Sequence, residues 1–101
     1  MSQSVCILGV TGSIGQSTLK ILQQHAERYS VFAVTAHSRM QELVDICQQF
    51  QPEIAVVPQA KVDELRQLLV AANLQSIEIL ADEAGLIAVA EHPEVGLRYL
   101  R

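Results

Sequence analysis

Short apolar runs alternate along the chain with stretches whose apolar residues recur every three or four positions. Four runs rich in β-branched and aliphatic residues predict buried strands, at residues 5–8, 31–36, 54–57 and 77–80. Amphipathic helices are predicted after each of the first three runs, at residues 13–25, 40–50 and 62–72. The alternation therefore predicts a parallel sheet whose strands are connected by helices.

A fourth helix is predicted after the last of these strands. We expect Asp82 to be its N-cap, because a carboxylate there can accept hydrogen bonds from the first N–H groups of a helix. Gly85 is expected to weaken this helix and Pro93 to end it. The predicted fold class is α/β, with about four strands alternating with four helices in a doubly wound parallel sheet.

The composition allows one domain with a single core. The chain has 101 residues, of which 50% are hydrophobic and 18% charged, and its formal net charge is −4. This length excludes a complete two-domain enzyme, and the scattered basic residues argue against a nucleic-acid or anionic-membrane partner. No apolar run approaches the roughly 18 residues of a membrane span, and the first residues lack a secretory signal pattern. We expect a cytoplasmic protein.

The residues that could hold a metal or act as nucleophiles form no recognisable set. Cys6 falls in a predicted strand and Cys47 on a predicted helix face, so both are expected to be reduced and buried. The three histidines lack metal-ligand spacing, and no Ser-His-Asp set or pair of carboxylates occurs on one face. We expect neither a metal site nor a catalytic residue in this segment.

A glycine-rich segment follows the first predicted strand, where a helix is predicted to begin. Gly9, Gly12 and Gly15 are spaced Gly-x-x-Gly-x-x-Gly, a variant of the dinucleotide-binding fingerprint. Gly9 is expected to make the tight turn, Gly12 to let the backbone approach a pyrophosphate, and Gly15 to let the helix pack closely on the sheet. Thr11 and Ser13 offer hydroxyl groups to the same phosphate oxygens. The alternative is a turn with a close helix contact and no ligand.

The end of the second predicted strand selects the cofactor in a Rossmann-like domain. An Asp or Glu there accepts hydrogen bonds from the ribose of NAD, but this chain has His37, Ser38 and Arg39 and no acid. Arg39 is expected to attract the 2′-phosphate of NADP(H), since a charge-assisted contact contributes about 1.5 to 3 kcal/mol. Ser38 can donate to the same phosphate, and His37 can cap the adenine. The alternative for Arg39 is an exposed side chain in the first turn of its helix.

The segment from Cys6 to Leu19 resembles the opening of the 1-deoxy-D-xylulose 5-phosphate reductoisomerase family. The family form is close to Ile-Leu-Gly-Ser-Thr-Gly-Ser-Ile-Gly-x-x-Thr-Leu, and this chain reads Ile-Leu-Gly-Val-Thr-Gly-Ser-Ile-Gly-Gln-Ser-Thr-Leu. The likeness continues at residues 27–34, 47–52 and 54–57. It therefore covers most of the chain.

The resemblance implies the NADPH-binding segment of an oxidoreductase of non-mevalonate isoprenoid biosynthesis. Members of the family rearrange 1-deoxy-D-xylulose 5-phosphate and reduce the product to 2-C-methyl-D-erythritol 4-phosphate, using NADPH and a divalent cation, Mg²⁺ or Mn²⁺. Residues 37–39 stand where the family commonly has Gly-Lys-Asn, and the resemblance leads us to expect that Arg39 takes the role of the lysine, one position later. The residues that match cofactor-contacting positions of the family are Thr11, Gly12, Ser13 and Ile14.

The resemblance also implies that much of the enzyme lies outside this chain. The family continues with an apolar strand similar to Val-Met-Ala-Ala-Ile-Val-Gly, whereas residues 94–101 read Glu-Val-Gly-Leu-Arg-Tyr-Leu-Arg. The family's metal-binding acids, its site for the phosphorylated sugar and the segments that form its homodimer lie further along. Residues 1–101 are expected to be the N-terminal part of an NADP(H)-binding Rossmann domain, inactive alone, with an exposed strand edge or an uncovered apolar helix face.

Two other functions stay open from the residues. A different NADP-dependent oxidoreductase, such as a semialdehyde dehydrogenase, would also use a Thr-Gly-x-x-Gly turn. A short-chain reductase needs a Tyr-x-x-x-Lys pair, which the chain does not supply, because Ala33 stands four residues after Tyr29. A nucleotide-binding module without chemistry would have the same glycine segment.

Overall fold

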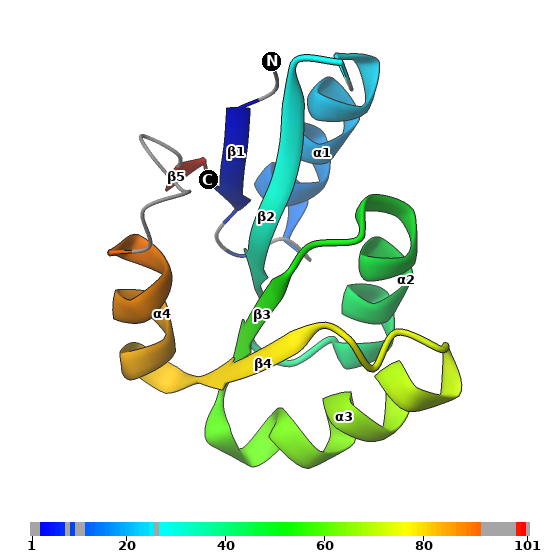
Figure 1. The fold of residues 1–101 in the computed structure, drawn as a ribbon, viewed down its shortest axis with the longest axis vertical. Helices are drawn as coiled ribbons and strands as arrows, with labels where there is room; N and C mark the ends of the chain where they lie inside the picture. The colour runs from blue at the N-terminus through cyan, green and yellow to red at the C-terminus, as the bar shows by residue number, and fades with distance from the viewer. Residues whose placement is uncertain (1–2, 8, 10–11, 26, 92–98, 101) are drawn as a thin grey trace.

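The computed structural model describes residues 3–7, 9, 12–25, 27–91 and 99–100. Within them, parallel strands form one sheet in the order β4-β3-β2-β1-β5 (Figure 1). The strands are β1 (Gln3–Ile7), β2 (Tyr29–Thr35), β3 (Ile54–Val57), β4 (Glu78–Ala81) and β5 (Tyr99–Leu100). The helices are α1 (Ser13–Gln24), α2 (Met40–Phe50), α3 (Val62–Ala71) and α4 (Asp82–Ala90), with a short 3₁₀ helix, η1 (Gln59–Lys61), before α3.

The predicted order of strands and helices is confirmed. β3 and α2 begin and end at the predicted residues, and β4 is displaced by one residue toward the C-terminus. The sequence pattern does not predict η1 or β5, because segments of three and two residues are too short to show an apolar period. Leu8 and Pro93, the predicted ends of a strand and a helix, lie outside the described residues.

Helices cover both faces of the sheet, as a doubly wound fold requires. Neighbouring residues of a strand point to opposite faces, and Ala55 of β3 belongs to a different core cluster from Ile54. The cluster of Ala55 contains Leu43 of α2 and Leu65 of α3, together with residues of α1. The cluster of Ile54 contains Val89 of α4. α1, α2 and α3 therefore pack on one face of the sheet and α4 on the other (Figure 1).

The order of the strands places a topological switch point beside β1. The chain moves outward from β1 to β4 and then returns to form β5 on the other side of β1. β5 pairs with β1 through Cys6 opposite Tyr99 and Ile7 opposite Leu100, so the predicted exposed strand edge does not occur at this part of β1. In open parallel sheets, ligands bind outside the carboxyl ends of the strands near such a switch point. A ligand site is therefore expected at the end of β1.

The prediction of an uncovered apolar helix face is confirmed on α4. Leu86 is 40% exposed and Ile87 is 49% exposed, although Val89 of the same helix is buried. Gly85, Leu86 and Ile87 follow one another directly, so apolar residues occur on all sides of this helix. α4 therefore presents apolar surface to solvent beside the face that it buries on the sheet.

The predicted effect of Gly85 on α4 needs correction. A Cβ at this position would lie 2.8 Å from the Cβ of Leu80 and 2.9 Å from Cγ1 of Val56. The helix can approach β3 and β4 this closely only because residue 85 has no side chain. Gly85 lowers the intrinsic helix propensity, as predicted, but it also permits the contact that seats α4 on the sheet.

The predicted N-cap of α4 is wrong. The residue that precedes the helix is Ala81, and no side chain forms a capping hydrogen bond there. Asp82 has a φ of 57°, and its Oδ1 accepts a hydrogen bond of 2.9 Å from the N–H of Gln59. The carboxylate therefore binds the start of η1, a segment distant in sequence, instead of the first turn of its own helix.

Both cysteines are free and buried, as the sequence predicts. Burial raises the pKa of Cys6 from 9.0 to about 11 and the pKa of Cys47 from 9.0 to about 12, because the interior does not solvate a thiolate. The free energy of unfolding therefore does not change with the ionisation of these thiols below pH 9. It falls as the pH rises from 9 toward the folded-state pKa values, because over this range only the unfolded chain releases the thiol protons.

A disulfide reagent added at pH 8 is expected to react with the native chain ~100-fold more slowly than with the chain unfolded in guanidinium. The absorbance of the released thiolate measures both rates, and both cysteines of the chain are expected to react after unfolding. Fast labelling of either thiol in the native protein would contradict the burial described above.

Candidate functional site

The connection between β1 and α1 makes a tight turn at glycine. Gly9 has a φ of 63°, a left-handed conformation that glycine adopts without steric cost. Gly12 is the N-cap of α1, and its N–H donates to the carbonyl oxygen of Gly9 at 3.0 Å. A Cβ on Gly12 would lie 3.3 Å from that same oxygen. The segment therefore closes on itself just before the helix begins.

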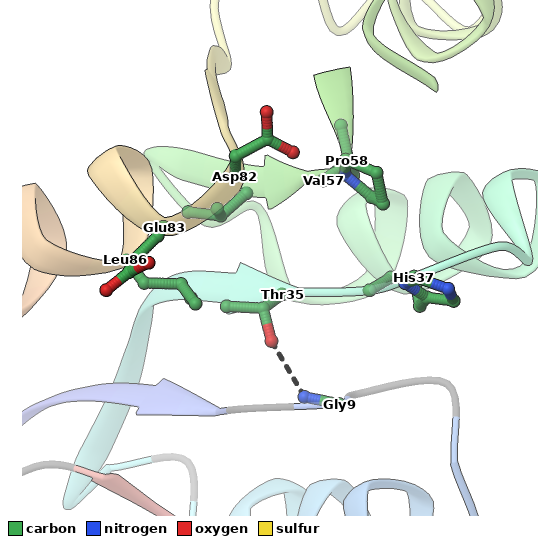
Figure 2. A pocket seen from close by; sticks show the side chains of 10 residues that line it. Gly9, Thr35, His37, Val57, Pro58, Asp82, Glu83 and Leu86 are labelled. Atoms are coloured by element: carbon green, nitrogen blue, oxygen red, sulfur yellow. Dashed lines mark hydrogen bonds between the residues drawn. The ribbon is translucent and has the colours of Figure 1, made fainter. Parts of the chain in front are cut away.

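A hydrogen bond fixes this turn to the neighbouring strand. The N–H of Gly9 donates to Oγ1 of Thr35 at 2.8 Å, and Thr35 is a buried polar residue at the end of β2 (Figure 2). Thr35 is not among the site residues predicted from the sequence. Its signal is the single hydroxyl within the apolar run of residues 31–36, since a buried hydroxyl needs a partner.

A pocket of about 580 Å³ opens beside the turn, at the carboxyl ends of the strands. β1 leads into it through Gly9, β2 through its last residues, β3 through Val56 and Val57, and α4 through its first turns. Figure 2 shows His37 at one end of the pocket and Glu83 and Leu86 at the other. The lining residues are Gly9, Thr35, Ala36, His37, Val56, Val57, Pro58, Asp82, Glu83 and Leu86.

The pocket combines an apolar wall with acidic groups. Ala36, Val56, Val57 and Leu86 offer aliphatic surface that can pack against a flat ring, and the exposed surface of Leu86 belongs to this wall. The carboxylate of Glu83 provides a hydrogen-bond acceptor at the same end. The arrangement suits an apolar heterocycle that carries an amino group.

The start of α1 adds a site for an anion. The first N–H groups of a helix have no partner within it, and the helix dipole makes this end positive. Gly12 supplies no side chain that would occupy these donors. Thr11 lies outside the described residues, and Ser13, Ile14 and Gly15 are described only by their backbone in α1. The contacts predicted for their side chains stay predictions.

The three residues predicted to select the cofactor lie at the end of β2, and the structure separates them. His37 lines the pocket, whereas Ser38 and Arg39 do not. Arg39 precedes α2, and its Nη1 lies 3.6 Å from Oε2 of Glu42, with the Arg39 side chain 64% exposed. An exposed ion pair of this kind is weak, so the guanidinium can leave it for a stronger anion.

Within the described part of the chain, no three or more His, Cys, Asp or Glu side chains come together in an arrangement that could hold a metal ion. No helix among these residues has the length and apolar character needed to cross a membrane.

The sheet order, the glycine turn and the pocket at the carboxyl ends define an α/β domain of the Rossmann-like class. A family model described as 1-deoxy-D-xylulose 5-phosphate reductoisomerase matches residues 5–97. The chain therefore belongs to the 1-deoxy-D-xylulose 5-phosphate reductoisomerase family.

The relatives and solved structures support this membership. The chain is 59% identical over 97 residues to the 1-deoxy-D-xylulose 5-phosphate reductoisomerase of Acinetobacter baumannii strain SDF. These residues are 96% of the chain and 24% of the relative. It is similar to a crystal structure of DOX-P reductoisomerase in complex with magnesium, with a TM-score of 0.89 and 38% identity over 94% of the chain and 24% of that structure.

A second crystal structure, of DOX-P reductoisomerase in complex with NADPH, fosmidomycin and magnesium, has a TM-score of 0.86 and 39% identity, and covers 92% of the chain and 22% of that structure. The chain thus spans about a quarter of the length of the relatives it matches.

Proposed function

We propose that this chain is the NADPH-binding segment of a 1-deoxy-D-xylulose 5-phosphate reductoisomerase. The activity proposed for the whole enzyme is the isomerisation of 1-deoxy-D-xylulose 5-phosphate and its NADPH-dependent reduction to 2-C-methyl-D-erythritol 4-phosphate. We propose a cytoplasmic homodimer that uses a divalent cation, with the metal ligands and the sugar-phosphate site outside this chain. The similarity to a structure that contains NADPH supports the choice of cofactor.

The observation that carries the proposal is the glycine turn at the start of α1, next to the pocket. Gly9 and Gly12 keep side chains away from the positive end of the helix, where the cofactor pyrophosphate would bind. The other residues proposed to contact the pyrophosphate are Thr11, Ser13, Ile14 and Gly15. The adenosine part would pack on the aliphatic wall of the pocket. When bound, NADPH supplies the hydride for the reduction.

Titration of the folded chain with NADPH, followed by the fluorescence of the reduced nicotinamide, tests this proposal. Saturable binding that excess NADP⁺ reverses is the expected result. A folded chain that leaves the fluorescence unchanged at near-millimolar cofactor would contradict it. The experiment concerns binding alone, because the proposed catalytic groups lie outside the chain.

Replacing Arg39 by alanine is expected to weaken NADPH binding about tenfold and to leave NADH binding unchanged. The proposed reason is that the guanidinium leaves Glu42 and pairs with the 2′-phosphate, which NADH lacks. Parallel titrations with the two cofactors measure the difference. Arg66→Ala is a matched control, because Arg66 is 62% exposed and forms a similar pair with Asp63 on α3. Equal weakening for both cofactors would contradict a contact with the 2′-phosphate.

A further inference from the structure

We propose that Asp82 is a positioning residue of the cofactor pocket. Its side chain holds the start of α4 against the connection between β3 and η1. Nothing in the sequence pattern assigns this role to it. The inference rests on the proposed NADPH binding, because its purpose is to keep the pocket at the width that the nucleotide requires.

The backbone at Asp82 is the first observation. Its φ of 57° lies in the left-handed region, which is uncommon for residues other than glycine. In this conformation Oδ1 of Asp82 accepts a hydrogen bond of 2.9 Å from the N–H of Gln59, across 23 residues of sequence. Asp and Asn occupy this region more readily than other residues with a side chain, because their short polar side chains can form local hydrogen bonds.

The second observation is that η1 begins without a side-chain cap from its own segment. Gln59 is its first residue, and the residue before it is Pro58, which forms no side-chain cap. The N–H of Gln59 would otherwise have no acceptor from its own segment. The carboxylate of Asp82 accepts a hydrogen bond from this N–H at the exposed start of η1.

The third observation is the place of this bond at the pocket. Pro58 and Asp82 both line it (Figure 2), and Gln59, the donor of the bond, directly follows Pro58. The bond therefore connects two of its walls. Glu83 and Leu86, which follow Asp82 in α4, line the same pocket. The close contact of Gly85 with β3 and β4 fixes the distance of α4 from the sheet. The Asp82–Gln59 bond then fixes the start of the helix beside η1.

The pairing of Val57 with Ala81 holds the two segments together up to the residues before Pro58 and Asp82, and the Asp82–Gln59 bond extends this connection into the first turn of α4. Loss of the bond is expected to loosen that turn, which carries Glu83 and Leu86 at the pocket. We expect Asp82→Ala to raise the dissociation constant of NADPH about fivefold, the effect of losing one ordinary hydrogen bond. Asp82→Asn keeps an oxygen acceptor and the left-handed preference, so its dissociation constant is expected to stay within about twofold of the wild type.

Two more variants complete the design. Gln59→Pro removes the donor while Asp82 stays intact, at the first position of a helical segment, where proline is tolerated. It is expected to weaken NADPH binding as much as Asp82→Ala does, and it replaces that variant if Asp82→Ala does not fold. Asn73→Ala is the control for backbone strain, since Asn73 has a φ of 64° but does not line this pocket. It is expected to lower stability and leave NADPH binding unchanged.

The test combines NADPH titrations with amide hydrogen exchange of the cofactor-free chain. Faster exchange at Gln59 in Asp82→Ala, together with weaker binding in both Asp82→Ala and Gln59→Pro, is the expected result. Unchanged exchange at Gln59, unchanged binding in either variant, or equal weakening in Asp82→Asn would overturn the inference. If the wild-type chain itself binds no NADPH, the proposed function fails. Faster exchange at Gln59 in Asp82→Ala would then still show that the hydrogen bond forms, which separates a failure of the proposed function from a failure of the contact.

Discussion

Replacing Gly12 by valine is expected to weaken NADPH binding ~100-fold or more while the fold persists. Gly12 is the N-cap of α1, and a β-branched side chain there would occupy the approach to the first N–H groups of the helix. Its Cβ would also stand 3.3 Å from the carbonyl oxygen of Gly9, which forces the turn to shift. A fluorescence titration measures the affinity, and circular dichroism verifies the fold.

Two variants accompany this measurement. Gly12→Ala introduces the Cβ alone and is expected to fall between the wild type and Gly12→Val. Gln23→Val places the same β-branched residue at an exposed position near the other end of α1, and it is expected to bind NADPH normally. Retention of near wild-type affinity by Gly12→Val would show that the cofactor does not approach this turn.

Replacing Gly85 by alanine is expected to lower the free energy of unfolding by about 2 kcal/mol. In an ordinary helix this substitution raises stability by about 1 kcal/mol, because alanine has the higher helix propensity. Here the new methyl group would stand 2.8 Å from the Cβ of Leu80 and 2.9 Å from Cγ1 of Val56, so the helix must move away from the sheet. The sign of the change therefore separates close packing from propensity.

Urea unfolding followed by circular dichroism measures this effect. Ala88→Gly is the control, because Ala88 is exposed on the same helix and its replacement changes the propensity alone. It is expected to lower the free energy of unfolding by about 1 kcal/mol. Stabilisation by Gly85→Ala would mean that α4 does not need its close seat on β3 and β4.

The sequence predicts the fold well because its main signals are periodic. Runs such as residues 54–57, buried on both faces, and the apolar stripe of α2 are set by local pattern and survive in the folded chain. Gly9 is predictable for a similar reason, since a strand that turns into a helix within a few residues needs a left-handed position.

The errors occur where distant segments decide the local structure. Asp82 follows the usual rule for an N-cap, but its carboxylate binds Gln59, and that neighbour is set by the position of β3 beside β4. Gly85 is read from helix propensity, which contains no information about Leu80 beneath the helix. Thr35 looks like an ordinary strand residue until Gly9 is placed next to it. In each case the missing information is a tertiary contact.

The pairing of β5 with β1 has a consequence for how the chain folds during synthesis. β1 holds residues 3–7, whereas its partner on that side, Tyr99–Leu100, is made almost at the end of the described chain. A ribosome that adds residues one at a time releases β1, β2, β3 and β4 long before β5 can join them. The hydrogen-bonding edge of β1 on that side stays open throughout this period, and contacts between such distant residues also form slowly. Until then β1 is an edge strand open to association, although it lies inside the sheet of the folded chain.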